Sequence, residues 1–458
     1  MIAPARRAAY EVLRAVSDDT LDLPAALARA RDALRDPRDR ALAGEIAIGV
    51  LRWRGALDAM IVTLARRPLA RLDREVTDIL RLGLYQLWQL QRVPPSAVVD
   101  DAVELTRVAH RGRASALVNA SLRAFTRTSA DRLLPKAPAD PARSRKQALE
   151  YLSTALSHPL WLVERWLDRY GFDATAEWLK FNNSAAPLTL RVNTLRTATA
   201  AVREALGASA VTTDPARYAP DALVVCEGNP LATRSFAAGE FIVQDEASQL
   251  VAHMAAARAG ERVLDACAAP GGKTVVMAAE SGGRALIVAA DVRRRRVALL
   301  AETLRRTAVA AHVLQMDLRR PVPLAPVFDC VLVDAPCSGL GTVRRDPDIK
   351  WRRDAAALPV LAAAQRALVA NAAGAVRPGG RLVYATCSSE PEENDEVIDG
   401  FLQQVPAFVP MARADIERLP RGGALSQVCD EHGRLRTLPF QHGLEAFFAA
   451  VVVKGRAL

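Results

Sequence analysis

The chain contains 458 residues, of which 50% are hydrophobic, and carries a formal net charge of +10 at pH 7. Its length suggests about three domains with large buried cores, so a soluble globular protein is expected. No apolar run approaches the roughly 18 residues of a membrane span, and the first residues lack the apolar segment of a signal peptide. These features argue against a membrane or secreted protein and make the cytoplasm the expected location.

The N-terminal region is predicted to be helical. Apolar residues recur there at helical spacing, clearly so over 9–16 and 76–87. Pro94 and Pro95 interrupt this pattern, and Ser96 follows them as a candidate N-cap. The pattern predicts an all-α bundle.

The positive charge is concentrated in the same region. Residues 1–146 contain 26 Lys and Arg against 17 Asp and Glu, which accounts for nearly all of the net charge. A cationic domain favours polyanions through counterion release, although such a charge is often only a solvated face. Charge alone therefore leaves binding to nucleic acid open.

Three segments of this region resemble a known family. They are IGVLRWRGALDAMI, LRLGLYQLWQLQRVPPSAVVDDAVELTR and LVNASLRAFTR, and they are similar to the RNA-binding antitermination-factor domain of the NusB type. The similarity spans most of residues 6–127. It implies an RNA-binding bundle, which we place at residues 1–134, of a kind also found at the N-terminus of a bacterial ribosomal-RNA methyltransferase.

The middle of the chain offers little chemistry. Residues 128–147 are rich in Pro, Ala and charge without a clear period, which predicts a linker. SHPLWLVERWLDRYG predicts an amphipathic helix that ends at Gly171, and PLTLRVNTLR alternates as a strand does. FIVQDEASQL predicts a short strand that runs into a helix. We expect a small α+β connecting subdomain over residues 148–235.

Residues 236–458 alternate short β-branched runs with helix-length segments. Strands are predicted at VLD, ALIVAADV, AHVLQMDL, FDCVLVD and GGRLVYAT, which together indicate a parallel, doubly wound α/β sheet of the Rossmann-like kind. Ligands of such sheets bind outside the carboxyl ends of the strands. The polar residues at those ends should therefore converge on one crevice, and they are Asp265, Asp291, Asp317, Asp334, Thr386 and Cys387.

The stretch VLDACAAPGGKT, residues 263–274, predicts a strand, a tight turn and the start of a helix. Its small residues let backbone N–H groups face a nucleotide-like ligand. A Walker loop would need Gly at Cys267, and G-x-G-x-x-G is absent. Asp291, at the end of the next strand, is spaced to accept from ribose hydroxyls. A nucleoside without a required triphosphate is expected, with S-adenosylmethionine favoured and NAD as the runner-up.

Six cysteines are widely spaced without a CxxC pair, so neither a zinc site nor a disulfide framework is expected. DAPCSG and ATCS each place a thiol, Cys337 and Cys387, where helix N-termini can favour the thiolate. The residue pattern leaves these two thiols equivalent as nucleophiles. Cys226, Cys330 and Cys429 are expected to be buried and inert.

The chemistry-bearing motifs carry a second resemblance. DACAAPGGKT, DAPCSGLGTVRRDPDIKW, PGGRLVYATCS and EPEEN are closely similar to the bacterial RNA cytosine-C5 methyltransferases of the Sun/Fmu/RsmB type. The resemblance implies a class I S-adenosylmethionine-dependent methyltransferase domain over residues 236–458. It also implies transfer of a methyl group to C5 of a cytosine in 16S ribosomal RNA.

The same resemblance assigns roles to single residues. It makes Cys387 the nucleophile, which adds to C6 of the cytosine, and Cys337 the thiol that assists product release. Asp334 would steady the cytosine ring. The cofactor positions that it implies are Cys267, Ala268, Ala269, Pro270, Gly271, Gly272, Lys273, Asp291, Asp317 and Asp334.

Further expectations concern the partners. The loop RRDPDIKWRR, residues 344–353, combines cations with Trp351 and is expected to grip RNA beside a flipped base. A monomer without a metal is expected. The alternatives are the same chemistry on another RNA, a noncatalytic RNA-binding or antitermination protein, and a nucleotide-dependent oxidoreductase.

Overall fold

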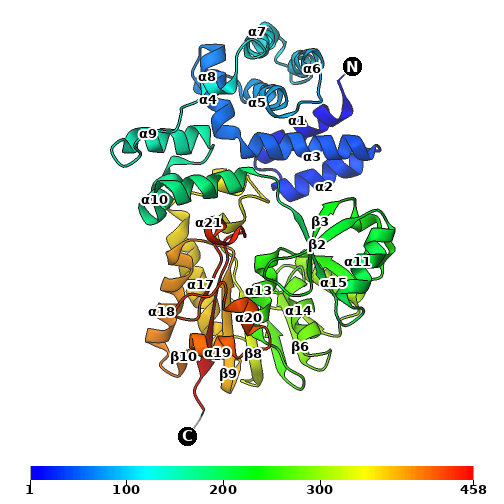
Figure 1. Cartoon of the computed structure of the whole chain (residues 1–458), viewed down its shortest axis with the longest axis vertical. Coiled ribbons are helices and arrows are strands. Elements are labelled where there is room, and N and C mark those ends of the chain that lie inside the picture. Colours follow the sequence, from blue (N-terminus) through cyan, green and yellow to red (C-terminus); the bar gives the residue numbers. More distant parts are fainter. Residues whose placement is uncertain (1, 457–458) are drawn as a thin grey trace. The chain divides into compact units, whose positions relative to one another are not determined.

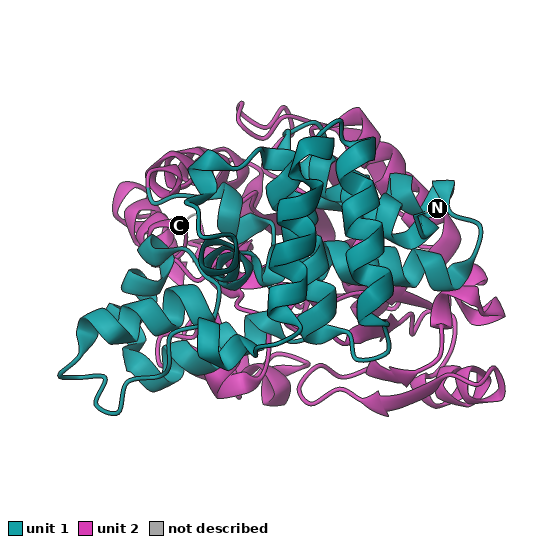
Figure 2. Ribbon diagram, turned by 90° about the horizontal axis from the view of Figure 1, so that it is seen from above, with its two compact units in different colours: residues 1–185, 343–355 teal, residues 186–342, 356–458 magenta. Residues whose placement is uncertain are grey.

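The structure is a computed structural model that describes residues 2–456. The chain forms two compact units, drawn in teal and magenta in Figure 2. Unit 1 comprises Met1–Ala185 and Val343–Ala355, and unit 2 comprises Ala186–Thr342 and Ala356–Leu458. A short segment from the C-terminal half of the chain thus belongs to the N-terminal unit.

Unit 1 is helical, as predicted. Its core is formed by apolar residues at helical spacing, among them Leu13, Ile46, Leu57, Leu80 and Leu122, each at most 1% exposed. Its helices are α1 (Pro4–Ser17), α2 (Leu23–Ala33), α3 (Pro37–Arg52), α4 (Arg54–Ala65), α5 (Arg74–Gln89), α6 (Pro95–Val108), α7 (Ser115–Phe125), α8 (Ala130–Leu133), α9 (Arg145–Glu150), α10 (Leu160–Asn183) and α16 (Ile349–Arg352), with helical turns η1 (Leu69–Arg71), η2 (Gly112–Ala114) and η3 (Tyr151–Ala155). Figure 1 labels α1 to α10.

One local prediction in unit 1 needs correction. Helix α6 already begins at Pro95, because the fixed φ of proline suits the first helical position, so Ser96 lies inside the helix and is not its N-cap. Gly171 ends the predicted helix as expected, because its φ of 78° and ψ of 177° are not helical, and α10 consists of two helices that meet at this kink.

The segment Val343–Ala355 packs on residues of unit 1. Lys350 is fully buried, and its Nζ donates to the carbonyl oxygen of Arg52 at 2.9 Å. Trp351 donates from Nε1 to the carbonyl oxygen of Leu51 at 2.6 Å. These two bonds hold the segment at the end of α3.

Unit 2 contains a small antiparallel sheet in the order β2-β3-β1-β4. Its strands are β1 (Leu188–Val192), β2 (Thr212–Pro215), β3 (Ala222–Glu227) and β4 (Phe241–Val243), accompanied by α11 (Thr199–Ala208), η4 (Pro230–Ala232) and α12 (Arg234–Ala237). The predicted strand in PLTLRVNTLR is confirmed as β1. The contacts group residues 148–185 with unit 1, whereas this sheet lies in unit 2, and the proposed division into three domains stays a prediction.

The large sheet of unit 2 runs β10-β12-β9-β8-β5-β6-β7, with β11 beside β12. Its strands are β5 (Arg262–Asp265), β6 (Leu286–Asp291), β7 (His312–Gln315), β8 (Phe328–Asp334), β9 (Val376–Thr386), β10 (Phe408–Pro410), β11 (Leu435–Arg436) and β12 (Phe448–Lys454). The helices and turns around it are α13 (Glu246–Ala255), α14 (Gly272–Glu280), α15 (Arg294–Thr307), η5 (Leu340–Thr342), α17 (Ala357–Ala373), η6 (Pro391–Glu393), α18 (Asp395–Gln404), α19 (Arg413–Glu417), α20 (Gly422–Leu425) and α21 (Pro439–His442).

The predicted parallel arrangement holds for the run β9-β8-β5-β6-β7. The sheet as a whole is mixed, because β12 pairs antiparallel with β9 and β10 pairs antiparallel with β12. Apolar side chains from the two faces of the sheet enter separate cores, as alternation along the strands requires. Among the helices of residues 2–456, none is long and apolar enough to cross a membrane.

Candidate active site

Polar residues gather at the carboxyl ends of neighbouring strands of the large sheet. β5 ends at Asp265, β6 at Asp291, β8 at Asp334 and β9 at Thr386, and these strands are adjacent in the order β9-β8-β5-β6. Parallel strands present their carboxyl ends at one edge, so the predicted convergence of these residues is observed.

The turn after β5 makes a cradle at this edge. Gly271 adopts φ +109°, a conformation that favours glycine, and α14 starts directly after it. A Cβ on Gly272 would lie 3.2 Å from the amide of Gln244. The cradle is a small hollow of about 90 Å³, lined by Val243, Gln244, Ser248, Asp265, Cys267, Ala268, Ala269, Pro270, Gly272, Lys273 and Asp334.

Lys273 and Asp334 form an ion pair in this hollow. The Lys273 Nζ donates to Asp334 Oδ2 at 2.6 Å and to Ser248 Oγ at 3.0 Å. Burial acts to lower the pKa of Lys273, but the Asp334 carboxylate outweighs it, so the pKa is raised and the ammonium stays charged.

Asp265 is fully buried at the base of the cradle. Its Oδ2 accepts from Thr274 Oγ1 at 2.7 Å, while its Oδ1 has no partner among the described residues. Burial raises the pKa of Asp265 to about 7, against the opposing effects of Thr274 and Lys273. A second buried acceptor without a partner, Gln244 Oε1, lines the same hollow. Buried acceptors of this kind are expected where a ligand with donor groups binds.

The residues of the hollow fit one part of a nucleoside-bearing cation. Two unpartnered acceptors and the Asp334 carboxylate suit a ligand that carries donors and a positive charge. Because pockets for whole small molecules measure roughly 300–1,000 Å³, a hollow of about 90 Å³ could hold only a portion of such a ligand.

Asp291 and Asp317 lie outside the lining of this hollow. Asp291 ends the strand next to β5, where its Oδ1 accepts from the backbone N of Arg293 at 3.2 Å and its Oδ2 lies 3.5 Å from Arg296. Asp317 follows the edge strand β7 and is engaged by the side chain of Arg319 at 2.8 and 2.9 Å. These bonds to Arg319 lower the pKa of Asp317 to about 2.

The two thiols singled out by the sequence lie together. The Sγ atoms of Cys337, after β8, and Cys387, after β9, are 3.1 Å apart. The contact with Cys387, followed by burial, raises the pKa of Cys337 well above its usual value. The carbonyl oxygen of Cys387 accepts from the backbone N of Gly341 at 3.0 Å. A Cβ added to Gly341 would lie only 1.8 Å from the carbonyl oxygen of Ala446, so this close approach requires glycine.

The remaining cysteines are also free. Cys330 and Cys429 are buried, as expected. The expectation is wrong for Cys226, which lies exposed on β3 with its Sγ 3.3 Å from Asp214. Burial raises the pKa of Cys267, so this thiol in the cradle is neutral.

The prediction that the cations of the loop 344–353 grip RNA is wrong for Lys350, whose side chain is fully buried within unit 1. Trp351 is partly exposed and its indole N–H donates to the carbonyl oxygen of Leu51, so its contact with RNA stays a prediction. A lone Lys beside a Trp gives no sign in the sequence of whether it binds a ligand or anchors the loop.

Other residues of the site carried no recognised signal. Gln244 and Ser248 lie in FIVQDEASQL, which was expected to be structural, yet they line the cradle. Glu393 and Asn394 lie in EPEEN and are at most 1% exposed beside the thiol loops. An acidic run usually marks a solvated surface, so only the structure reveals these two.

Unit 1 has a cationic hollow of its own. It measures about 680 Å³, lies between η1 and η2, and has Arg67, Arg71, His110, Arg111 and Arg113 in its lining. Arg111 pairs with Asp73 and Glu75. The exposed Arg67, Arg71 and Arg113 make no ion pair with any residue that the structure describes.

Three family models match the chain. Residues 252–453 match the family described as 16S rRNA methyltransferase RsmB/F, and residues 3–127 match the NusB family. Residues 158–232 match the ferredoxin-like domain of RsmF/B-like methyltransferases.

Curated relatives and solved structures cover nearly the whole chain. The chain is 35% identical over 415 residues to the probable ribosomal RNA small subunit methyltransferase B of Bacillus subtilis, covering 90% of each chain. It is 34% identical to the ribosomal RNA small subunit methyltransferase B of Vibrio cholerae, covering 98% of this chain and 97% of the relative. The crystal structure of PH0851 superposes with a TM-score of 0.79 at 25% identity, covering 99% of each chain.

Proposed function

Because the chain belongs to the RsmB/F family of 16S rRNA methyltransferases, we propose that it transfers a methyl group from S-adenosylmethionine to C5 of a cytosine in 16S rRNA. The proposed route is a covalent adduct between a cysteine and C6 of that cytosine. With ribosomal RNA as substrate, the cytoplasm is the proposed location.

The pair of thiols is the observation that best supports cytosine-C5 chemistry. C5 of cytosine is a poor nucleophile, and a thiolate that adds to C6 turns the ring into an enamine whose C5 can attack an electrophile. The Cys337 and Cys387 sulfurs are 3.1 Å apart, so both can reach the same face of one base. A reaction that uses a single thiol nucleophile does not require a second thiol in contact with the first.

Cys387 is the proposed nucleophile, on the strength of the family resemblance. Its Sγ adds to C6 after losing its proton, and after methylation the proton on C5 must leave so that the S–C6 bond can break and restore the aromatic ring. Cys337 is proposed to assist this release: once it has lost its own proton, its thiolate can accept the proton from C5, and the raised pKa makes that thiolate a stronger base.

Asp334, which Lys273 holds by an ion pair, is the proposed polar contact of the base. Lys273 occupies Oδ2 of the Asp334 carboxylate, which leaves Oδ1 as the oxygen that can bond to the cytosine ring. Hydrogen bonding from a fixed carboxylate orients the ring and stabilises the charge that develops on it as the thiolate adds. The Asp334 role assigned by resemblance is compatible with this ion pair.

The cradle after β5 is the proposed cofactor site. When bound, S-adenosylmethionine supplies an electrophilic methyl group. Asp265 and Gln244 offer buried acceptors without a partner among the described residues, α14 starts at Gly272 in the lining of the hollow, and Asp291 ends the adjacent strand as an acceptor for ribose hydroxyls. Asp317 is proposed at the margin of this site, since Arg319 already engages its carboxylate.

The cationic hollow of unit 1 is the proposed holding site for RNA. Arg67, Arg71 and Arg113 are exposed there, and guanidinium groups match phosphate oxygens in geometry as well as charge. A second hollow, of about 730 Å³, is lined by Asp100, Asp101 and Glu104 and has the wrong charge for phosphates.

Methylation of purified small-subunit RNA tests the proposal directly. The protein is incubated with RNA from cells that lack this gene and with S-adenosylmethionine, and the digested nucleosides are separated by mass. We expect 5-methylcytidine, formed by the wild type and not by Cys387→Ala. Methylation at another atom, or of another RNA only, would contradict the proposal, and RNA binding without methylation would favour the noncatalytic alternative.

The roles of the two thiols separate in a gel assay. Cys387→Ser cannot form the S–C6 bond, so it should release unmodified RNA. Cys337→Ser can still add and methylate, so it should accumulate a protein–RNA adduct that survives denaturing electrophoresis. An adduct from Cys387→Ser alone would make Cys337 the nucleophile, and no adduct from either variant would contradict covalent catalysis.

A further inference from the structure

The loop that carries Cys337 is bonded to a buried carboxylate. Glu393, the last residue of η6, has no exposed surface. Its Oε1 accepts from the backbone N of Ser338 at 2.8 Å, and its Oε2 accepts from Ser338 Oγ at 2.5 Å. Because Ser338 directly follows Cys337, the carboxylate holds this loop by both main chain and side chain.

The same carboxylate holds the loop that carries Cys387. Ser388, the residue after Cys387, donates from Oγ to Glu393 Oε2 at 2.5 Å. Gln365 of α17 also donates to this carboxylate, from its Nε2 to Glu393 Oε1 at 2.9 Å. Each carboxylate oxygen therefore accepts two hydrogen bonds, and the two thiol loops share one acceptor.

Asn394 adds a second hold on the Cys387 side. Its Oδ1 accepts from Thr386 Oγ1 at 2.5 Å, and its Nδ2 donates to the carbonyl oxygen of Ser388 at 2.9 Å. The residues before and after Cys387 are thus both bonded to one amide, which restricts the backbone that carries the thiol.

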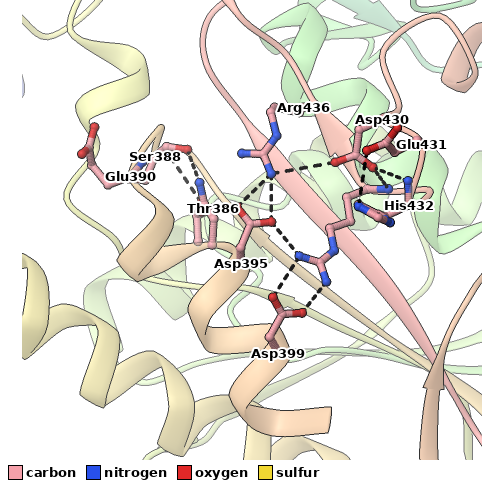
Figure 3. A network of polar contacts seen from close by, with 11 residues as sticks. Thr386, Ser388, Glu390, Asp395, Asp399, Asp430, Glu431, His432 and Arg436 are labelled. Atoms are coloured by element: carbon pink, nitrogen blue, oxygen red, sulfur yellow. Dashed lines mark hydrogen bonds and ion pairs between the residues drawn. The ribbon is translucent and has the colours of Figure 1, made fainter. Parts of the chain in front are cut away.

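The segment that provides these two side chains is itself anchored. Asp395, the first residue of α18, pairs with Arg434 at 2.6 Å and with Arg436 at 2.9 Å, and Arg434 also pairs with Asp399 (Figure 3). Arg436 lies on β11, which pairs with β12, the neighbour of β9. Ion pairs therefore connect the start of α18 to the sheet, whose strand β9 ends directly before Cys387.

We infer that Glu393 is a positioning residue, whose carboxylate sets the separation of Cys337 and Cys387 by bonding the residue that follows each of them. The inference rests on the proposed function, since it assigns both thiols to one reaction. Glu393→Leu would test it, because a leucine side chain is of similar size and has no hydrogen-bond acceptor. All four donors would lose the carboxylate, and the loops would be released from their common partner.

The separation of the thiols can be measured without RNA or cofactor. Phenylarsine oxide forms two As–S bonds with a close pair of thiols, and its oxygen leaves as water with the two thiol protons. The wild type should bind one arsenic tightly, and Cys337→Ser should not. Glu393→Leu should bind at least about 10-fold more weakly, because the second As–S bond loses its effective concentration. Glu396→Leu, the same change at an exposed carboxylate three residues on, is the matched control and should bind as the wild type does.

Steady-state kinetics supply the second readout. Misplacement of a reacting group by about 1 Å lowers the rate roughly 100-fold, so kcat of Glu393→Leu should fall by about that factor. The KM for RNA and the Kd for S-adenosylmethionine should stay within about two-fold, since Glu393 does not line the cradle. A general folding defect would instead change all of these quantities together.

An arsenical affinity or a kcat that survives Glu393→Leu would overturn the inference. If that variant loses S-adenosylmethionine binding, Ser388→Ala, which removes one of the four hydrogen bonds, decides by the same two readouts. If the wild type forms no 5-methylcytidine, the proposed function fails, while the arsenical comparison still shows whether Glu393 holds the two thiols together.

Discussion

Lys350 is a buried amine whose protonation should make the stability of unit 1 depend on pH. Burial, with a smaller effect from Arg52, lowers its pKa well below the usual value. In the unfolded chain the same amine has a pKa of about 10.4. Above this lowered pKa and up to about pH 10, the folded protein therefore leaves this site unprotonated, whereas the unfolded chain binds a proton there.

The size of the effect follows from the one proton taken up on unfolding. Because the unfolded state binds more protons, the free energy of unfolding rises with pH, by about 1.4 kcal/mol for each pH unit. Lys350→Met removes this titration, so in a scan from pH 7 to pH 9 the difference in stability between wild type and variant should change by about 1.4 kcal/mol for each pH unit above the lowered pKa.

Other shifted groups of unit 1 titrate outside this window. The pKa of His158 is lowered, chiefly by burial, so its contribution falls below about pH 6.5. Burial raises the pKa of Tyr10 to about 12 and that of Tyr85 further, so both contribute only at higher pH. Burial raises the pKa of Asp346 to about 6, so this carboxyl group titrates below pH 7.

Tryptophan fluorescence makes the measurement specific. All six tryptophans lie within Met1–Ala185 and Val343–Ala355, so urea unfolding followed by tryptophan emission reports unit 1 alone. Lys180→Met, at an exposed position on α10, is the matched control and should keep the pH dependence of the wild type. Equal slopes for wild type and Lys350→Met would mean that the buried amine stays protonated and would refute the reasoning.

Three further predictions concern the sites. Asp291→Ala should weaken S-adenosylmethionine binding by about 1–3 kcal/mol, the loss expected for a charge-assisted hydrogen bond, and an unchanged titration curve would remove Asp291 from the site. Arg67→Ala combined with Arg113→Ala should weaken RNA binding and lower the slope of log K against log salt by about 2, whereas Asp100→Asn should not weaken binding. Asp265 holds its proton to about pH 7 when folded, so it lowers the stability of unit 2 as pH rises from about 4 to 7. Asp265→Asn should remove this loss of about 4 kcal/mol, as measured by calorimetry across that range, and an unchanged pH profile would contradict the raised pKa.

The parts of the fold that could be predicted are those with local signals. The strands from β5 to β9 are runs of apolar residues closed by polar ones, and the turn at Gly271 needs a residue without a side chain. Because parallel strands bring their carboxyl ends to one edge, the convergence of Asp265, Asp334 and Cys387 could be predicted from the alternation of strands and helices along the sequence.

The parts that could not be predicted depend on contacts between distant residues. β12 is a continuous apolar run, and its antiparallel place beside β9 is fixed by register across more than 60 residues of chain. Glu393 resembles its acidic neighbours in sequence. Only the four hydrogen bonds that its carboxylate accepts in the folded protein distinguish it from them. Lys350 likewise reads as a surface cation, because the carbonyl that it bonds lies 298 residues earlier.

The capture of Val343–Ala355 by unit 1 has a consequence for synthesis on the ribosome. When residue 185 has been translated, the helical unit still lacks the segment that bonds to Leu51 and Arg52. Residues 186–342 must be added first, which takes roughly 8 to 30 seconds at about 5–20 residues per second. During that interval the nascent N-terminal unit exposes the end of α3 that Lys350 and Trp351 later cover, so its completion waits for the emergence of the thiol loop that precedes them.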